Sequence, residues 1–176
     1  MLPEQDLRGL IESRWFVPLL ALASREEGFR SAAVAARLGI SRSMLAGALD
    51  RLLGKGWLAR NPGHGHPLRP EYVLAEAARP IGAWCERVME EKRNLALSGD
   101  PLGRWALPLV GRLDRRWERF SWLEAQLSPI SPRSLSLTLK QLLELRLVDR
   151  RLEESFPPRP LYGLTSRGQR LARAMA

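Results

Sequence analysis

Few side chains of this 176-residue chain have the types and spacing that catalysis requires. Glu86 and Glu90 lie one helical turn apart, a spacing that could pair two carboxylates for general acid–base chemistry. However, Arg87, Lys92 and Arg93 lie close by in the sequence. A solvated helix face with paired charges is therefore the favoured interpretation of these residues.

The thiol and imidazole groups are too few to build a metal or nucleophile site. The chain has one cysteine, Cys85, and two histidines, His64 and His66, so a structural zinc site would need carboxylates or a second chain to complete it. Both histidines lie beside glycines in the stretch 62–67, which is typical of a solvated loop. No catalytic triad set, GxGxxG motif or GxxxxGK[ST] motif is present. We expect no enzyme activity, no metal and no cofactor.

The charge balance indicates a different chemistry. Lys and Arg number 28 against 19 Asp and Glu, so the net charge is +9 and the sequence pI is about 11.0. Such an excess favours a polyanionic partner, with nucleic acid first. The acidic N-terminal stretch lacks the apolar segment of a signal peptide, and no stretch is apolar enough to span a membrane. We therefore expect a cytoplasmic protein without a membrane partner.

The sequence contains an internal repeat with an offset of 90 residues. Residues 14–74 align without a gap on residues 104–164. The identical pairs include Trp15 with Trp105 and Tyr72 with Tyr162. A repeat of this length is too long for a solenoid unit and predicts a duplicated domain.

The second copy shows the order of elements more clearly. Its helices and strands are expected at 100–113, 120–127, 132–145, 147–152, 161–164 and 166–175, with a proline-rich hairpin loop at 153–160. Asp100-Pro101 and Ser131-Pro132 each combine an N-cap with a proline at the first helical position. Pro108 predicts a kink in the first helix, and Thr165 is expected to cap the last one.

This order describes a winged helix-turn-helix. We therefore predict a mainly α fold with small β-hairpin wings, built as two tandem winged helix-turn-helix domains that form a pseudo-dimer. The first domain comprises residues 1–97, including a long connecting helix at 81–97 with an apolar stripe. Residues 98–103 form the joint, and residues 104–176 form the second domain. Cys85 lies on the apolar stripe, which favours a buried structural thiol over a redox sensor.

The second copy resembles the HxlR-type winged helix regulators of the wider MarR-like group. The resemblance covers positions 104–171. It rests on RW at 104–105 with LPLV at 107–110, RF at Arg119-Phe120, ISPRSLSLTLKQLLELRLVDRR at 130–151 and FPPRPLYGLTSRGQRL at 156–171. The first copy keeps GISRSMLAGALDRLLGKGWLAR and HPLRPEYVL. The resemblance implies a transcriptional regulator whose relatives are homodimers that bind palindromic operators. A chain with two copies resembles a covalent pseudo-dimer, and further homodimerisation stays open. The N-terminal cysteine often present in the family is absent here, which argues against thiol-based sensing.

The residues themselves also point to double-stranded DNA. A recognition helix needs a capped N-terminus, short residues and donors that reach base edges. The helix at 132–145 supplies all three. Its Leu135, Leu139, Leu142 and Leu143 are expected to face the core, with Leu137 on or near the opposite side. The expected DNA-contacting residues of this domain are Arg133, Ser134, Ser136, Lys140 and Gln141, with Arg159 in the wing.

The first copy is expected to bind DNA less well. Its candidate residues are Arg42, Ser43 and Arg51, with Arg69 in the wing. Gly47 weakens this helix by about 1 kcal/mol relative to alanine, and Asp50 would repel phosphate. The second copy also carries the larger excess of cations. An alternative function is a protein-interaction scaffold of tandem winged helices in a chromosome-associated complex, although the high net charge favours DNA.

Overall fold

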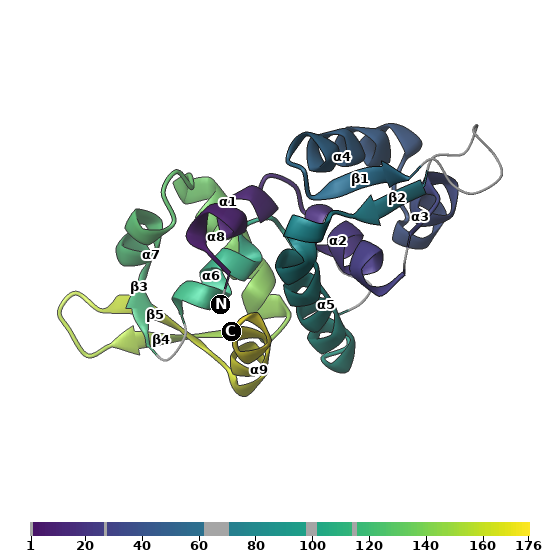
Figure 1. The fold of residues 1–176 in the computed structure, drawn as a ribbon. Helices are drawn as coiled ribbons and strands as arrows, with labels where there is room; N and C mark the ends of the chain where they lie inside the picture. The colour runs from purple at the N-terminus through teal and green to yellow at the C-terminus, as the bar shows by residue number, and fades with distance from the viewer. Residues whose placement is uncertain (1, 27, 62–70, 98–101, 114–115) are drawn as a thin grey trace. The chain divides into compact units, whose positions relative to one another are not determined.

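The computed structural model describes residues 2–26, 28–61, 71–97, 102–113 and 116–176. The chain divides into two compact units, Leu2–Met89 and Glu90–Ala176. The boundary between them falls inside the long helix α5, Arg79–Asn94, which is shown in Figure 1. We expected the joint at 98–103, of which residues 98–101 lie outside the described residues.

The N-terminal unit has three core helices followed by a hairpin. In chain order its elements are α1 (Glu4–Leu10), α2 (Phe16–Arg25), α3 (Ser31–Leu38), α4 (Arg42–Gly54), β1 (Leu58–Asn61), β2 (Glu71–Leu74), the 3₁₀ helix η1 (Glu76–Ala78) and α5. Strands β1 and β2 pair antiparallel, with Leu58 opposite Leu74. The residues between these strands, 62–70, include His64, His66 and Arg69 and lie outside the described residues.

The C-terminal unit has a similar order of elements, with three helices before its hairpin and one additional strand. Its elements are α6 (Ala106–Arg112), β3 (Glu118–Arg119), α7 (Phe120–Gln126), α8 (Pro132–Glu144), β4 (Val148–Glu153), β5 (Arg159–Leu164) and α9 (Ser166–Met175). The antiparallel sheet has the order β3-β5-β4. The β4–β5 hairpin projects from the helices of its unit (Figure 1). A mainly helical fold with small antiparallel sheets was predicted from the sequence and is confirmed.

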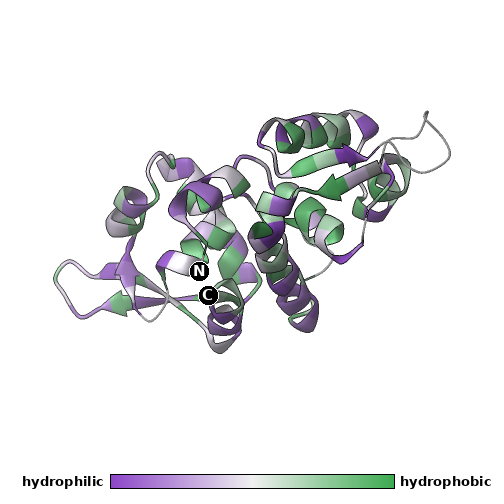
Figure 2. Cartoon of the chain, in the orientation of Figure 1, coloured by the Kyte–Doolittle hydropathy of each residue, from purple (hydrophilic) through white to green (hydrophobic). Residues whose placement is uncertain are grey.

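Each unit buries its own apolar core, because each helix carries a stripe of apolar residues at helical spacing. The largest fully buried side chains of the N-terminal unit are Phe16, Leu19, Leu20, Leu45, Leu49, Leu52 and Trp84. Those of the C-terminal unit are Leu109, Leu113, Leu123, Leu135 and Leu142. Hydrophilic residues predominate on the side of α5 that Figure 2 shows, opposite its buried stripe. Burial of these stripes is the main stabilising contribution to each unit.

The 90-residue offset of the sequence also relates elements of the structure. Helix α4 begins at residue 42 and α8 at residue 132, and they end at residues 54 and 144. Ser41 and Ser131 cap these helices in the same way, since each hydroxyl accepts a hydrogen bond from the amide three residues on, at 3.2 Å in both helices. Each cap contributes about 1 kcal/mol. The strand registers agree as well: Leu58 lies opposite Leu74, and Val148 lies opposite Leu164.

Most elements of the second copy were predicted correctly, but its first helix was not. The expected helix began at Asp100, whereas α6 begins at Ala106, with Trp105 as its N-cap. Residues 98–101 lie outside the described residues. Pro108 is therefore the third residue of α6. The backbone amides of the first helical residues have no acceptor within the helix, so a proline here removes no helical hydrogen bond. The kink expected at Pro108 has no structural cause, because no helical turn precedes it.

The wing of the second copy also differs from the prediction. The expected loop covered 153–160, but the strands remain paired out to Glu153 and Arg159, so the connection is shorter. Strand β3 was missed altogether. It consists of two residues, Glu118 and Arg119, that pair with Tyr162 and Leu161. A strand this short has no alternating pattern of its own and forms because β5 offers it an edge.

Candidate nucleic-acid interface

Helix α8 combines a buried apolar side with an exposed polar side. Leu135, Leu139 and Leu142 are buried as predicted, whereas Leu143 is half-buried. On the other side, Arg133, Ser136 and Lys140 are exposed. Spacings of three and four residues place these three side chains on one helix surface. The sequence therefore folds α8 so that its donors face outward along one stripe.

The N-terminus of α8 is suited to an anion. Among the first three residues of α8, Pro132 has no N–H and Ser134 donates to the Ser131 cap, which leaves the Arg133 amide at the positive end of the helix dipole. No acidic residue occurs in the first turn. Arg133, next to the cap, makes no ion pair within the part of the chain that the structure describes. Phosphate contact by this end of the helix is therefore unobstructed by an internal partner.

Two of the predicted contact residues are engaged with the protein itself. The Ser134 hydroxyl lies 2.9 Å from the Ser131 hydroxyl, and Ser134 is half-buried. The Gln141 side-chain oxygen accepts a hydrogen bond from the Gly103 amide at 3.2 Å. Lys140 lies 3.9 Å from Glu144, but both side chains are largely exposed, so this pair is weak and easily exchanged. The structure thus leaves Arg133, Ser136 and Lys140 as the most accessible donors.

The equivalent helix of the N-terminal unit, α4, presents fewer groups. Arg42 and Ser43 are exposed beside the cap. Arg51 turns back along its own helix: its Nε donates to the Gly47 carbonyl at 3.2 Å, and its guanidinium lies 5.3 Å from the centre of the Phe16 ring. Asp50 lies 3.9 Å from Arg60, so the nearest cation to this carboxylate comes from β1. That α4 binds DNA less well than α8 stays a prediction.

The second wing is organised by ion pairs and one stacked cation. Arg159 is exposed and lies directly opposite Glu153 in the β4–β5 register. Glu153 accepts two hydrogen bonds from Arg119, at 2.9 and 2.7 Å. These hydrogen bonds, more than any other factor, hold the pKa of Glu153 below its usual value of 4.5. Arg151 stacks over Trp117, with 4.3 Å between the guanidinium and the ring centre.

Some exposed apolar residues of this unit were not among the predicted DNA contacts, although Leu137 was expected on the outer side of its helix. Leu137 on α8 is 59% exposed, Leu152 on β4 is 62% exposed, and Phe156 at the end of the wing is fully exposed. Apolar side chains on a recognition helix can contact thymine methyl groups, and apolar side chains on a wing can insert into a minor groove. Leu137 lies outside the apolar spacing of α8, and its exposure could be inferred from this. Phe156 lies in a loop, where no periodic pattern could have identified it.

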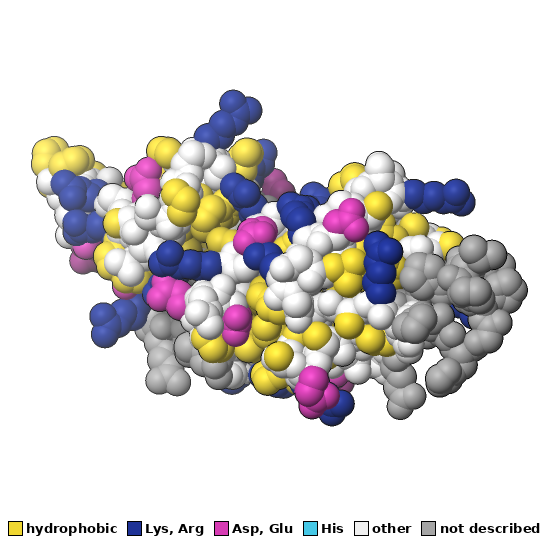
Figure 3. Space-filling model, turned by 45° about the horizontal axis from the view of Figure 1, so that its top comes forward, with side chains coloured by type: hydrophobic (Ala, Val, Ile, Leu, Met, Phe, Trp, Pro, Cys, Tyr) yellow, Lys and Arg dark blue, Asp and Glu magenta, His cyan; other side chains and the backbone are white. Residues whose placement is uncertain are grey.

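Charge is distributed singly rather than in one block. On the face that Figure 3 shows, Lys and Arg side chains stand apart from one another, with acidic and apolar side chains between them. The charge of +9 therefore does not form a continuous basic stripe on this face. A specific contact would rely on particular side chains such as Arg133 rather than on a uniform field.

Cys85 is fully buried on the apolar side of α5, as predicted for a structural thiol. Burial raises the pKa of this thiol strongly, because the interior disfavours the thiolate. Among the residues that the structure describes, no group of three or more His, Cys, Asp and Glu could hold a metal ion. None of the described helices is long and apolar enough to cross a membrane.

In the C-terminal unit, α7, α8, the wing and α9 follow the winged helix-turn-helix order. Residues 102–176 match the sequence model of the HxlR-like helix-turn-helix family. Over these residues the chain is similar to that family. A crystal structure from Porphyromonas gingivalis W83, named as a putative MarR-family transcriptional regulator, is 27% identical to this chain. That alignment covers 49% of this chain and 78% of the other, with a TM-score of 0.40. No curated protein matches the chain significantly.

Proposed function

We propose that this protein binds double-stranded DNA sequence-specifically and regulates transcription without catalysis. The observation that carries this proposal is the surface of α8 in the HxlR-like unit: a capped, anion-suited N-terminus followed by the exposed donors Arg133, Ser136 and Lys140. Helix α8 would lie in the major groove, with Arg133 forking to guanine or phosphate. Arg159 and Arg150 of the wing would contact the backbone or the minor groove.

We further propose that the chain is a tandem duplication that acts as a covalent pseudo-dimer. The matching limits of α4 and α8, their equivalent serine caps and the matching strand registers support a common origin for residues 1–97 and 104–176. A pseudo-dimer would present α4 and α8 to two half-sites of one operator. The two helices would then be separated by about 34 to 36 Å, one turn of DNA.

DNA binding can be tested by gel-shift titration of the whole chain with a random duplex at two salt concentrations. Phosphate contacts release counterions, so affinity should fall steeply as salt rises. Arg133→Ala combined with Lys140→Ala should weaken binding, because both donors belong to α8. The matched control is Arg8→Ala with Arg79→Ala, which also removes two exposed cations, each paired with a glutamate of the same or the adjoining helical segment.

Each outcome has a defined meaning. Loss of binding in the α8 variant and not in the control supports recognition by α8. Equal loss in both variants would show that net charge alone drives association. Absence of any binding by the unmodified chain would overturn the proposal and favour the protein-interaction scaffold.

A further inference from the structure

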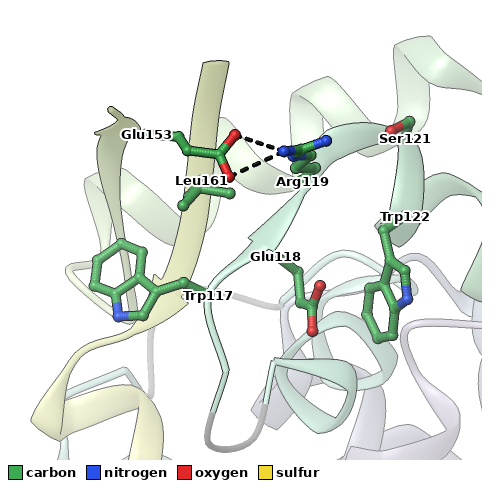
Figure 4. A pocket seen from close by; sticks show the side chains of 7 residues that line it. All are labelled: Trp117, Glu118, Arg119, Ser121, Trp122, Glu153 and Leu161. Atoms are coloured by element: carbon green, nitrogen blue, oxygen red, sulfur yellow. Dashed lines mark hydrogen bonds and ion pairs between the residues drawn. The ribbon is translucent and has the colours of Figure 1, made fainter. Parts of the chain in front are cut away.

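A shallow hollow lies in the C-terminal unit where β3 meets the start of α7 and the wing (Figure 4). Its volume is about 460 Å³. Two indole side chains, Trp117 and Trp122, contribute to its lining, together with Glu118, Arg119 and Glu153. None of these residues belongs to the proposed recognition surface of α8.

The lining of this hollow includes two carboxylates and one guanidinium, and the Arg151 guanidinium lies over the Trp117 ring. Glu153 and Arg119 form an ion pair, with hydrogen bonds of 2.9 and 2.7 Å from one guanidinium nitrogen, and so neutralise each other. Glu118 has no ion pair or hydrogen bond from its side chain within the described residues. Glu118 is therefore the carboxylate of the described lining that has no internal partner. A carboxylate without a partner attracts a cation and repels an anion.

The aromatic groups select for an organic cation. Trp122 is 38% exposed, unusual for so large an apolar side chain, and no cation lies over its ring in the part of the chain that is described. Figure 4 shows the Trp122 indole and the Glu118 carboxylate projecting in the same direction from α7 and β3. Trp117 already carries the Arg151 guanidinium 4.3 Å from its ring centre, so an indole of this hollow does hold a cation. Indole faces attract ammonium and guanidinium groups through the ring quadrupole.

We propose that this hollow binds an organic cation, of the quaternary or aromatic ammonium class, between the Trp122 indole and the Glu118 carboxylate. The indole covers the apolar substituents of the cation, and the carboxylate offsets its charge. A metal ion is a poor fit, because Glu118 is the one carboxylate of the described lining that is not already paired, and hard metals need several oxygen ligands. This proposal does not depend on DNA binding, and its test is carried out without DNA.

The test is a calorimetric or ligand-observed NMR titration of the whole chain with benzyltrimethylammonium at low ionic strength. Benzyl alcohol, which keeps the ring and lacks the charge, is the matched neutral probe. We expect saturable binding of the ammonium compound and none of the alcohol. Glu118→Gln should weaken binding about threefold, and Trp122→Ala about fivefold, as expected for an exposed ion pair and a cation–π contact.

Glu154→Gln is the control variant, since Glu154 is exposed on the wing, does not line the hollow and carries the same charge as Glu118. It should bind the ammonium compound as the unmodified chain does. Absence of saturable binding, equal binding of benzyl alcohol, or equal weakening by Glu154→Gln and Glu118→Gln would each overturn the proposal. Circular dichroism of the variants establishes that a loss of binding is not a loss of fold.

Discussion

One guanidinium nitrogen of Arg119, on β3, donates hydrogen bonds to both carboxylate oxygens of Glu153, on β4; these are the two outer strands of the C-terminal sheet. The guanidinium reaches past β5 and connects the residue before α7 to the end of β4 next to the wing loop. Hydrogen bonds between two charged groups are shorter and stronger than those between neutral groups. The wing therefore enters any DNA complex already attached to the strand that precedes α7.

This pair should make stability depend on pH in the acid range. Because the pKa of Glu153 is lowered when the protein folds, the pair stabilises the folded state above the usual pKa of 4.5. That stabilisation is lost as the pH falls through the lowered pKa. Glu153→Gln should therefore unfold more easily at neutral pH and lose less stability on acidification than the unmodified chain. Urea unfolding followed by circular dichroism at several pH values measures this, with Glu154→Gln as the control.

The two recognition helices should contribute unequally to DNA binding. The α8 variant, Arg133→Ala with Lys140→Ala, should reduce the salt slope of binding by about 0.9 for each phosphate that the protein no longer neutralises. Arg42→Ala with Arg51→Ala should change affinity less, because Arg51 is already occupied by Phe16 and the Gly47 carbonyl. Gel shifts at several salt concentrations make the comparison. Equal weakening in the two double variants would retain DNA binding but contradict the asymmetry.

The Arg42 and Arg51 variants also need a folding control. Removal of the Arg51 side chain gives up its interaction with the buried Phe16 ring, worth about 0.5–1 kcal/mol for an exposed cation. Arg42→Ala alone is therefore the cleaner probe of α4, and its melting temperature should equal that of the unmodified chain.

Two glycines should respond to alanine in opposite directions. A Cβ at Gly47, within α4, would meet nothing nearby, so Gly47→Ala should stabilise the protein by up to about 1 kcal/mol. A Cβ at Gly168, in the first turn of α9, would collide with the Leu147 carbonyl oxygen. Gly168→Ala should cost about 1–3 kcal/mol. Denaturant unfolding of both variants tests the pair, and stabilisation by Gly168→Ala would show that this carbonyl can move away.

Cys85 should behave as a core residue and not as a sensor. Its thiol is fully buried and its pKa is raised, so a thiol reagent should label it only when the protein unfolds. Cys85→Ala should cost about 1 kcal/mol of stability and leave DNA affinity unchanged. Labelling with a thiol reagent in native and denaturing buffer tests this. Rapid labelling of the native protein, with a change in DNA affinity, would contradict it.

The local sequence determined the elements that make the candidate interface. The Ser131-Pro132 cap and the spacing of Leu135, Leu139 and Leu142 predicted α8 to within one residue of its observed end. Thr165 was expected to cap the last helix, and its hydroxyl accepts a hydrogen bond from the Gly168 amide at 3.1 Å. Such features are readable because capping and helical periodicity involve residues only three or four positions apart.

The tertiary structure alone decided which side chains are available to a ligand. Gln141 was expected to reach outward from its helix, but the chain brings the Gly103 amide, 38 residues away in sequence, to its side-chain oxygen. Arg119 and Glu153 are 34 residues apart, and β3 exists only because β5 lies beside it. No local pattern encodes such pairings, because they arise from long-range packing of elements whose own patterns concern only burial. Which donors reach outward, and the hollow between Glu118 and Trp122, follow from that packing.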